Sequence, residues 1–146
     1  MAEAATLTVN INEEIFLNNN YRNSAVTYTV PDVVGVDNRI INIPSGSLVE
    51  LLRFSSSFNP GLAGTVISDS LGYLRLTNLE SVGTLYVNLV GAISGSSLTT
   101  LPPGSSFLMN STQLSGSVEE VAALKVFVGV DTNNPINIEY YLATTI

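Results

Sequence analysis

The side chains that could carry out acid–base chemistry in this chain are isolated carboxylates and a single lysine. A glycosidase needs two carboxylates that face each other across a cleft. The candidates are Asp69, Glu80, Asp131 and Glu139. All but one lie in turn-like segments, and no motif sets their spacing, so we interpret them as solvating residues. Lys125, which a Ser-Lys dyad would require, lies on the polar face of an alternating strand and is interpreted as a solvated or edge-protecting lysine.

Two further groups of residues could bind a ligand. Asp131-Thr132-Asn133-Asn134 places several oxygen ligands in one turn and could hold Ca²⁺. It lacks the spacing of an EF-hand loop, and Asp and Asn are ordinary turn residues, so a plain turn is favoured while the cation alternative stays open. Tyrosines could line a sugar platform, although the chain has no Trp, and tyrosines in strands are more often core or interface residues. They are Tyr21, Tyr28, Tyr73, Tyr86, Tyr140 and Tyr141.

The residue types that are missing exclude most catalytic machinery. The chain has no His and no Cys, so it can form neither a Ser-His nor a Cys-His pair and no usual zinc site. No glycine-rich segment has the lysine and the following helix of a phosphate-binding loop. We therefore predict that the protein is not an enzyme, with no catalytic, cofactor-binding or metal-binding residues and no cofactor.

The charge pattern argues against nucleic acid and membrane partners. Twelve acidic residues outnumber five basic ones, which gives a net charge of −7, and the basic residues are scattered singly. No basic stripe is present to neutralise phosphates or anionic lipid headgroups. No segment is long and apolar enough to span a bilayer, and the N-terminus lacks the pattern of a secretory signal. Only 12% of residues are charged, and the resulting neutral polar surface is a mild indication of assembly.

Alternating apolar and polar residues must position these side chains on strands. Leu7, Val9 and Ile11 share one face of a first strand, and Val26, Tyr28 and Val30 share a face of a second one, whose ladder Pro31 interrupts. Further strands are predicted at 40–43, 48–54, 65–67, 73–76, 84–89, 107–109, 124–130 and 136–142.

The segments between the strands read as turns and loops. Residues 78–83 have the length and the glycine of a hairpin loop that would join the strands on either side of it. Residues 91–104, rich in Gly, Ser, Thr and Pro, indicate a surface loop, and residues 117–123 are the one place for a helical turn. The pattern predicts an all-β protein, a sandwich or a barrel, with residues 1–146 forming a single domain.

Three stretches in the second half carry a family resemblance. The order YLRLTNLESVGTLYVNLV, then LPPGSSFLM, then LKVFVGVDTNNPINIEYYLATT resembles small virion proteins of tailed phages, particularly cyanophage-like ones. In that group a strand with a Thr-Asn turn leads to a valine-rich strand, a Pro-Gly-Ser hairpin and a closing strand with a Tyr-Tyr pair. The resemblance covers residues 71–146.

The resemblance implies an antiparallel β-sandwich, with the jelly-roll as one form that it could take. Such a protein decorates or cements a capsid or forms part of a head or tail appendage. The resemblance also implies a virion protein assembled in the host cytoplasm. Its partners would be the major capsid protein or other virion proteins, and it would form a homotrimer or homodimer. The alternative is a carbohydrate-binding or host-recognition module of a tail or head fibre.

Two segments are candidates for contact with neighbouring subunits. Residues 1–20 could form an extended N-terminal arm that pairs with a neighbour by strand addition, and residues 91–104 could contact a partner as a long loop. A frayed terminus and a plain surface loop are the alternatives.

Overall fold

A computed structural model describes residues 3–55, 65–67, 70–91, 95–110, 121–128 and 134–145. These residues form strands and their connections, with no α-helix among them. The strands are β1 Ala5–Glu13, β2 Phe16–Leu17, β3 Asn20–Tyr21, β4 Ser24–Ile43, β5 Leu48–Ser55, β6 Thr65–Ile67, β7 Leu71–Asn78, β8 Leu85–Gly91, β9 Ser96–Leu101, β10 Ser106–Met109, β11 Val121–Val128 and β12 Ile136–Thr145.

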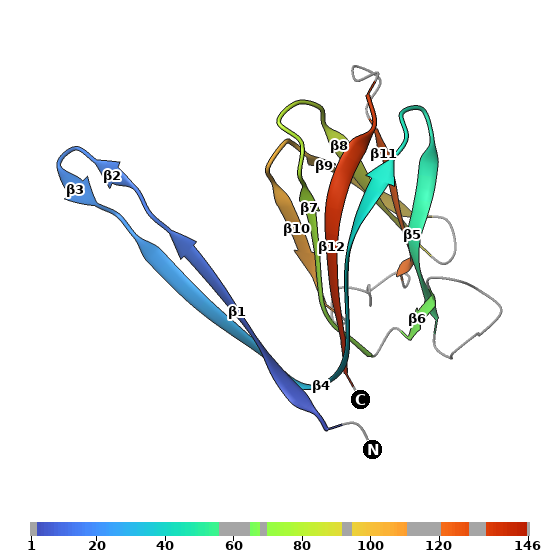
Figure 1. Ribbon diagram of the computed structural model, residues 1–146, viewed down its shortest axis with the longest axis horizontal. Helices are drawn as coiled ribbons and strands as arrows, with labels where there is room; N and C mark the ends of the chain where they lie inside the picture. Colours follow the sequence, from blue (N-terminus) through green and yellow to red (C-terminus); the bar gives the residue numbers. More distant parts are fainter. Residues whose placement is uncertain are drawn as a thin grey trace.

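The strands form two five-stranded sheets and one small hairpin (Figure 1). The first sheet has the order β1-β4-β12-β7-β10, and the second has the order β6-β5-β11-β8-β9. All pairs are antiparallel except β5 with β6. Within the sheets the pairing is nested along the chain: β4 pairs with β12, β5 with β11, β7 with β10, and β8 with β9. The predicted all-β antiparallel sandwich is confirmed.

The core lies between the two sheets and follows from the alternation in their strands. In β12 every second side chain from Ile136 to Leu142 is buried. Its neighbour β7 adds an apolar row from the same sheet, and β11 contributes one from the opposite sheet. The largest side chains in the described part of the chain with less than 2% of their surface exposed belong to this core. They are Ile43, Leu71, Leu74, Leu76, Leu85, Leu124, Ile136, Ile138, Val87, Val126 and Asn78.

The connection after β7 corrects one prediction. The sequence predicts that β7 and β8 form a hairpin, but they belong to different sheets, so residues 79–84 cross from one sheet to the other. The buried Asn78 holds this crossing: its Nδ2 donates to the carbonyls of Gly83 and Leu101, both at 3.0 Å, and its Oδ1 accepts from the Glu80 amide at 3.1 Å. Because loop length alone does not state which strands pair, the sequence favoured the simpler hairpin.

A second prediction is wrong within residues 91–104. β9, Ser96–Leu101, lies there and pairs along β8 from Leu85 to Val90, so β9 is an edge strand and not part of a loop. Its residues are exposed except Leu101, which explains why Ser and Thr dominate its composition. β-branched Thr fits a pleated edge as well as a loop.

The other predicted segments have different outcomes in the structure. Strands close to those predicted around 40–43, 48–54, 65–67 and 107–109 are present. In the sequence, residues 117–123 are the one segment that could host a helical turn; residues 121–123 begin β11 instead, whereas 117–120 lie outside the described residues. Asp69 and Asp131-Thr132-Asn133 also lie outside them.

β4 is the element that takes the chain out of the sandwich. It continues through Pro31, where an interruption was predicted, but an extra residue sits opposite β1 at Pro31–Asp32, and another opposite β12 at Val34. Asp32 has a positive φ of 59°. Such bulges bend a strand and increase its twist. The first half of β4 therefore leaves the sandwich with β1, and the two form a long arm with β2 and β3 at its tip (Figure 1).

Candidate interaction surface

The arm, defined as residues 5–30, is an amphipathic two-stranded ribbon. On one face the paired residues are Leu7 with Val30, Val9 with Tyr28, and Ile11 with Val26. The opposite face carries small polar residues such as Asn10 and Thr27, whose side chains hydrogen-bond at 3.0 Å. The alternation fixes the register, because a slip by one residue would place the apolar face in water.

The apolar face is buried at its base and uncovered further out. At the base, Val30 and Val33 pack with Tyr73 and Ala143 of the first sheet, and Leu7 lies against this cluster. Further along, the exposed fraction rises to 39% at Ile11 and 56% at Val26. A two-stranded hairpin is marginally stable alone in water. The sandwich thus supports one end of the arm and leaves the other end without a covering layer among the described residues.

The tip of the arm presents a compact apolar cluster. Asn18 and Asn19 both have positive φ, which forms a tight two-residue turn between β2 and β3. The turn brings the rings of Phe16 and Tyr21 together, with centroids 4.9 Å apart. These side chains are 59% and 77% exposed, and Leu17 between them is exposed as well. The tip is therefore a free aromatic surface within the described part of the chain.

A cleft of about 400 Å³ separates the middle of the arm from the first sheet. Val9, Ile11 and Tyr28 line it from the arm, and Tyr73 and Leu108 line it from the sheet. The side-chain amide of Asn110 donates to the Tyr28 hydroxyl at 3.3 Å and so links the two walls. Burial raises the pKa of the Tyr73 hydroxyl, so the hydroxyl stays protonated at neutral pH.

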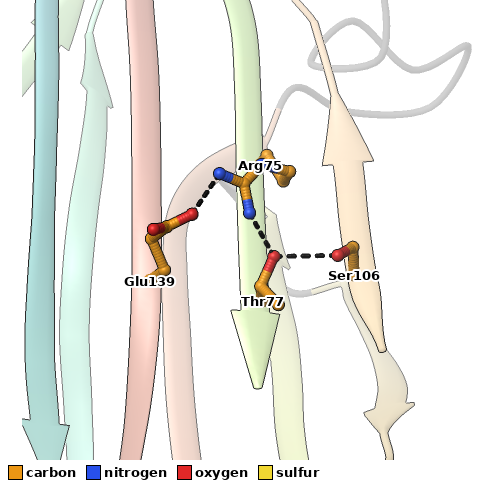
Figure 2. Close-up of polar contacts among 4 residues, drawn as sticks. All are labelled: Arg75, Thr77, Ser106 and Glu139. Carbon is orange, nitrogen blue, oxygen red and sulfur yellow. Dashed lines mark hydrogen bonds and ion pairs between the residues drawn. The ribbon is translucent and has the colours of Figure 1, made fainter. Parts of the chain in front are cut away.

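A row of polar side chains crosses the same outer face of the first sheet (Figure 2). Arg75 on β7 forms an ion pair with Glu139 on β12 and donates to the Thr77 hydroxyl. That hydroxyl lies 2.8 Å from the hydroxyl of Ser106 on β10. The row ties three neighbouring strands together, so its polar groups already have partners.

The predicted acid–base residues are not gathered into one arrangement. Of the four carboxylates, only two are described: Glu139 is held by Arg75, and Glu80 accepts the Asn137 amide at 3.0 Å. Both therefore have structural contacts. Lys125 lies opposite Glu50 on β5 and Asn88 on β8, away from the arm on the second sheet.

The tyrosines separate into different environments. Tyr28, Tyr73 and Tyr141 lie around the cleft and its polar margin, and the rings of Tyr73 and Tyr141 meet edge-on. Tyr21 is at the arm tip, and Tyr86 stacks on Phe127 outside the second sheet. The core contains Tyr140, and its burial raises the pKa of its hydroxyl to about 12.

The described residues contain no cluster of three or more acidic side chains arranged to hold a metal ion. No helix among them could cross a membrane. Comparison of the chain with protein-family models finds no match, and comparison with curated proteins finds none.

The sequence identified both apolar rows of the arm but missed how they combine. Leu7, Val9 and Ile11 on one strand and Val26 and Tyr28 on the next are visible as alternations. Their pairing into one ribbon, and the tight turn at Asn18-Asn19, required the structure. The signal that could have found them is the FLNNNY segment, where two asparagines able to adopt positive φ separate Phe16-Leu17 from Asn20-Tyr21.

Proposed function

We propose that this chain is a non-enzymatic virion structural protein that decorates or cements a phage capsid through protein–protein contacts. The observation that carries the proposal is the arm, which extends beyond the sandwich (Figure 1) and exposes the apolar side chains of Ile11 and Val26 along its length and the cluster of Phe16, Leu17 and Tyr21 at its tip. Fully burying one such side chain stabilises an association by about 1.5–3 kcal/mol before the costs of binding. The tip is therefore suited to act as an anchor in a neighbouring subunit.

The strand order supports the same reading of the sandwich. In nested pairing the first strand pairs with the last, the second with the second-last, and so on to the middle of the chain. This is the connectivity expected of a jelly-roll. We propose that the eight strands β4, β5 and β7 to β12 form one. Jelly-rolls recur in viral capsid and lectin domains. Since a fold does not assign a function, the arm and not the sandwich carries the proposal.

Quantitative mass spectrometry of density-purified particles from the same source tests the virion role. We expect the chain in a simple numerical ratio to the major shell protein. A few copies per particle would instead favour a tail or vertex component. Absence from the particles would overturn the virion role.

The contribution of the arm is tested separately by a tip variant. Phe16→Ser combined with Tyr21→Ser should lower the amount of protein retained on particles by about tenfold or more, since two aromatic anchors are lost. Leu98→Ser is the matched control, because Leu98 is an exposed apolar residue on β9 of the other sheet. Equal loss of retention in both variants would contradict an anchoring role of the tip.

The cleft supports a second candidate, a carbohydrate-binding or host-recognition module. Tyr28, Tyr73 and Asn110 combine aromatic surface with polar groups around a volume that a small saccharide could enter. A glycan array followed by titration would reveal one saturable site, lost in Tyr28→Ala and kept in Tyr86→Ala. Absence of glycan binding would remove this candidate and leave the virion role unaffected.

A further inference from the structure

One edge of the first sheet has no partner strand among the described residues. β4 pairs with β1 only from Ser24 to Val33, and β12 pairs with it from Val33 to Ile43 on the other side. Residues 34–43 consequently present backbone N–H and C=O groups along one open side. Long open edges of this kind are templates for pairing with another strand.

The side chains along this edge form two rows. On the outer face, Val36 and Ile40 lie on either side of Asn38, and their exposed fractions are 56% and 66%. On the other face Asp37 and Arg39 form an ion pair with 2.5 Å between Oδ2 and Nη2. The hydrogen bonds from Arg39 to Asp37 raise the pKa of the arginine, so the guanidinium stays charged.

The two rows are self-complementary about Asn38. We propose that residues 34–42 of two copies of this chain pair antiparallel around a twofold axis at Asn38, so that their first sheets join into one. In this register Asp37 of each copy lies opposite Arg39 of the other, and Val36 lies opposite Ile40. Opposite charges and apolar residues directly across a strand pair each stabilise it, and a twofold contact uses the same patch on both copies.

The charged row also selects this register over its neighbours. A slip of the pairing by two residues in one direction places Asp37 opposite itself, and the same slip in the other direction places Arg39 opposite itself. Like charges directly opposite are destabilising, and a one-residue slip moves each row to the wrong face. Asp37 and Arg39 thus oppose unselective strand pairing and permit the symmetric contact.

This dimer uses none of the apolar side chains of the arm, so it does not depend on the proposed virion role. The first test is sedimentation of the purified full chain over a range of concentrations. We expect a reversible dimer, and a monomer at all concentrations would overturn the inference.

Charge reversal tests the register. Arg39→Glu and Asp37→Arg each place like charges opposite one another, so each variant alone should dimerise about tenfold or more weakly than the wild type. An equimolar mixture of the two variants restores opposite charges across the strands and should form a heterodimer. Heterodimer formation also shows that both variants are folded. Dimers that ignore both substitutions, or variants that fail to pair when mixed, would overturn the inference.

Cross-linking locates the axis independently. The chain contains no cysteine, so Asn38→Cys introduces a single thiol. At the twofold axis the two thiols face each other, and a short thiol-to-thiol reagent should link them. The matched variant Asn42→Cys lies on the same strand face, and the two thiols would be about 27 Å apart across the dimer, given about 3.4 Å per residue. Equal cross-linking in the two variants would contradict the proposed register.

Discussion

The sandwich and the arm have the same two-residue alternation but bury it to different extents. In β12 the apolar row from Ile136 to Leu142 is almost completely covered by the second sheet. In β1 the apolar row is partly covered at Leu7 and Val9 and exposed at Ile11. The difference teaches that alternation specifies a face to be covered, whereas the neighbouring elements decide whether this chain covers it. The uncovered part of the arm is where a bound partner would remove the most apolar surface from water.

The largest expected effect of a single change lies at the crossing between the sheets. Asn78→Ala removes the three hydrogen bonds made by its side chain and leaves the carbonyls of Gly83 and Leu101 without that donor. We expect a loss of about 3 kcal/mol in the free energy of unfolding, measured by urea denaturation. Asn42→Ala is the control, since Asn42 is exposed and bonds only to the Asn137 side chain at 2.9 Å among the contacts described. A similar loss in both would contradict the special role of the buried amide.

Two valines compare the regions directly. Val126 in the sandwich core is fully buried and Val26 on the arm is mostly exposed. Val126→Ala should lower the free energy of unfolding by about 2 kcal/mol, through lost burial and the cavity that remains, and Val26→Ala by less than about 0.5 kcal/mol. Equal losses in urea denaturation would mean that the arm is covered in the isolated protein.

Gly72 lies where the arm meets the sandwich. A methyl group added there would come within 2.8 Å of both Val30 Cγ1 and Thr145 Cγ2. Gly72→Ala should destabilise the protein by about 1–2 kcal/mol and increase hydrogen exchange at the base of the arm more than in the core. Adding Val30→Ala to this variant removes one of the two clashes and should restore part of the loss. Unchanged exchange at the arm base would indicate that the contact does not seat the arm.

The smallest effect concerns pH and the core tyrosine. Burial raises the pKa of Tyr140 to about 12, above its value of about 10 in the unfolded chain. Between these values the unfolded state loses the proton first, so stability is unaffected below pH 10 and falls as the pH rises toward 12. At pH 11 this contributes a loss of about 1 kcal/mol. Tyr140→Phe should show a shallower decline in urea denaturation at pH 9 and pH 11, and parallel declines would contradict the assignment.

The sequence was sufficient for the local parts of the fold. The alternations at Leu7 to Ile11 and along β12 identified strands, because a period of two is a property of each strand by itself. The turn Pro44-Ser45-Gly46 was equally legible, and Gly46 has the positive φ that such turns require. The missing His and Cys limited the available chemistry without any structure.

The pairing of strands was decided by the tertiary structure. Residues 78–83 resemble a hairpin loop locally, yet buried Asn78 and the contacts of β7 with β12 and of β8 with β11 place the two strands in different sheets. The polar composition of β9 concealed a strand for a related reason, since an exposed edge and a loop favour the same residues. The candidate interaction surface was only partly visible. The sequence pointed to residues 1–20 as an arm, but their pairing with residues 24–33 of the same chain and the face left open depend on the bend of β4 near Asp32. Local patterns fix what each segment prefers, and long-range packing fixes which preferences are satisfied within the chain and which remain for a partner.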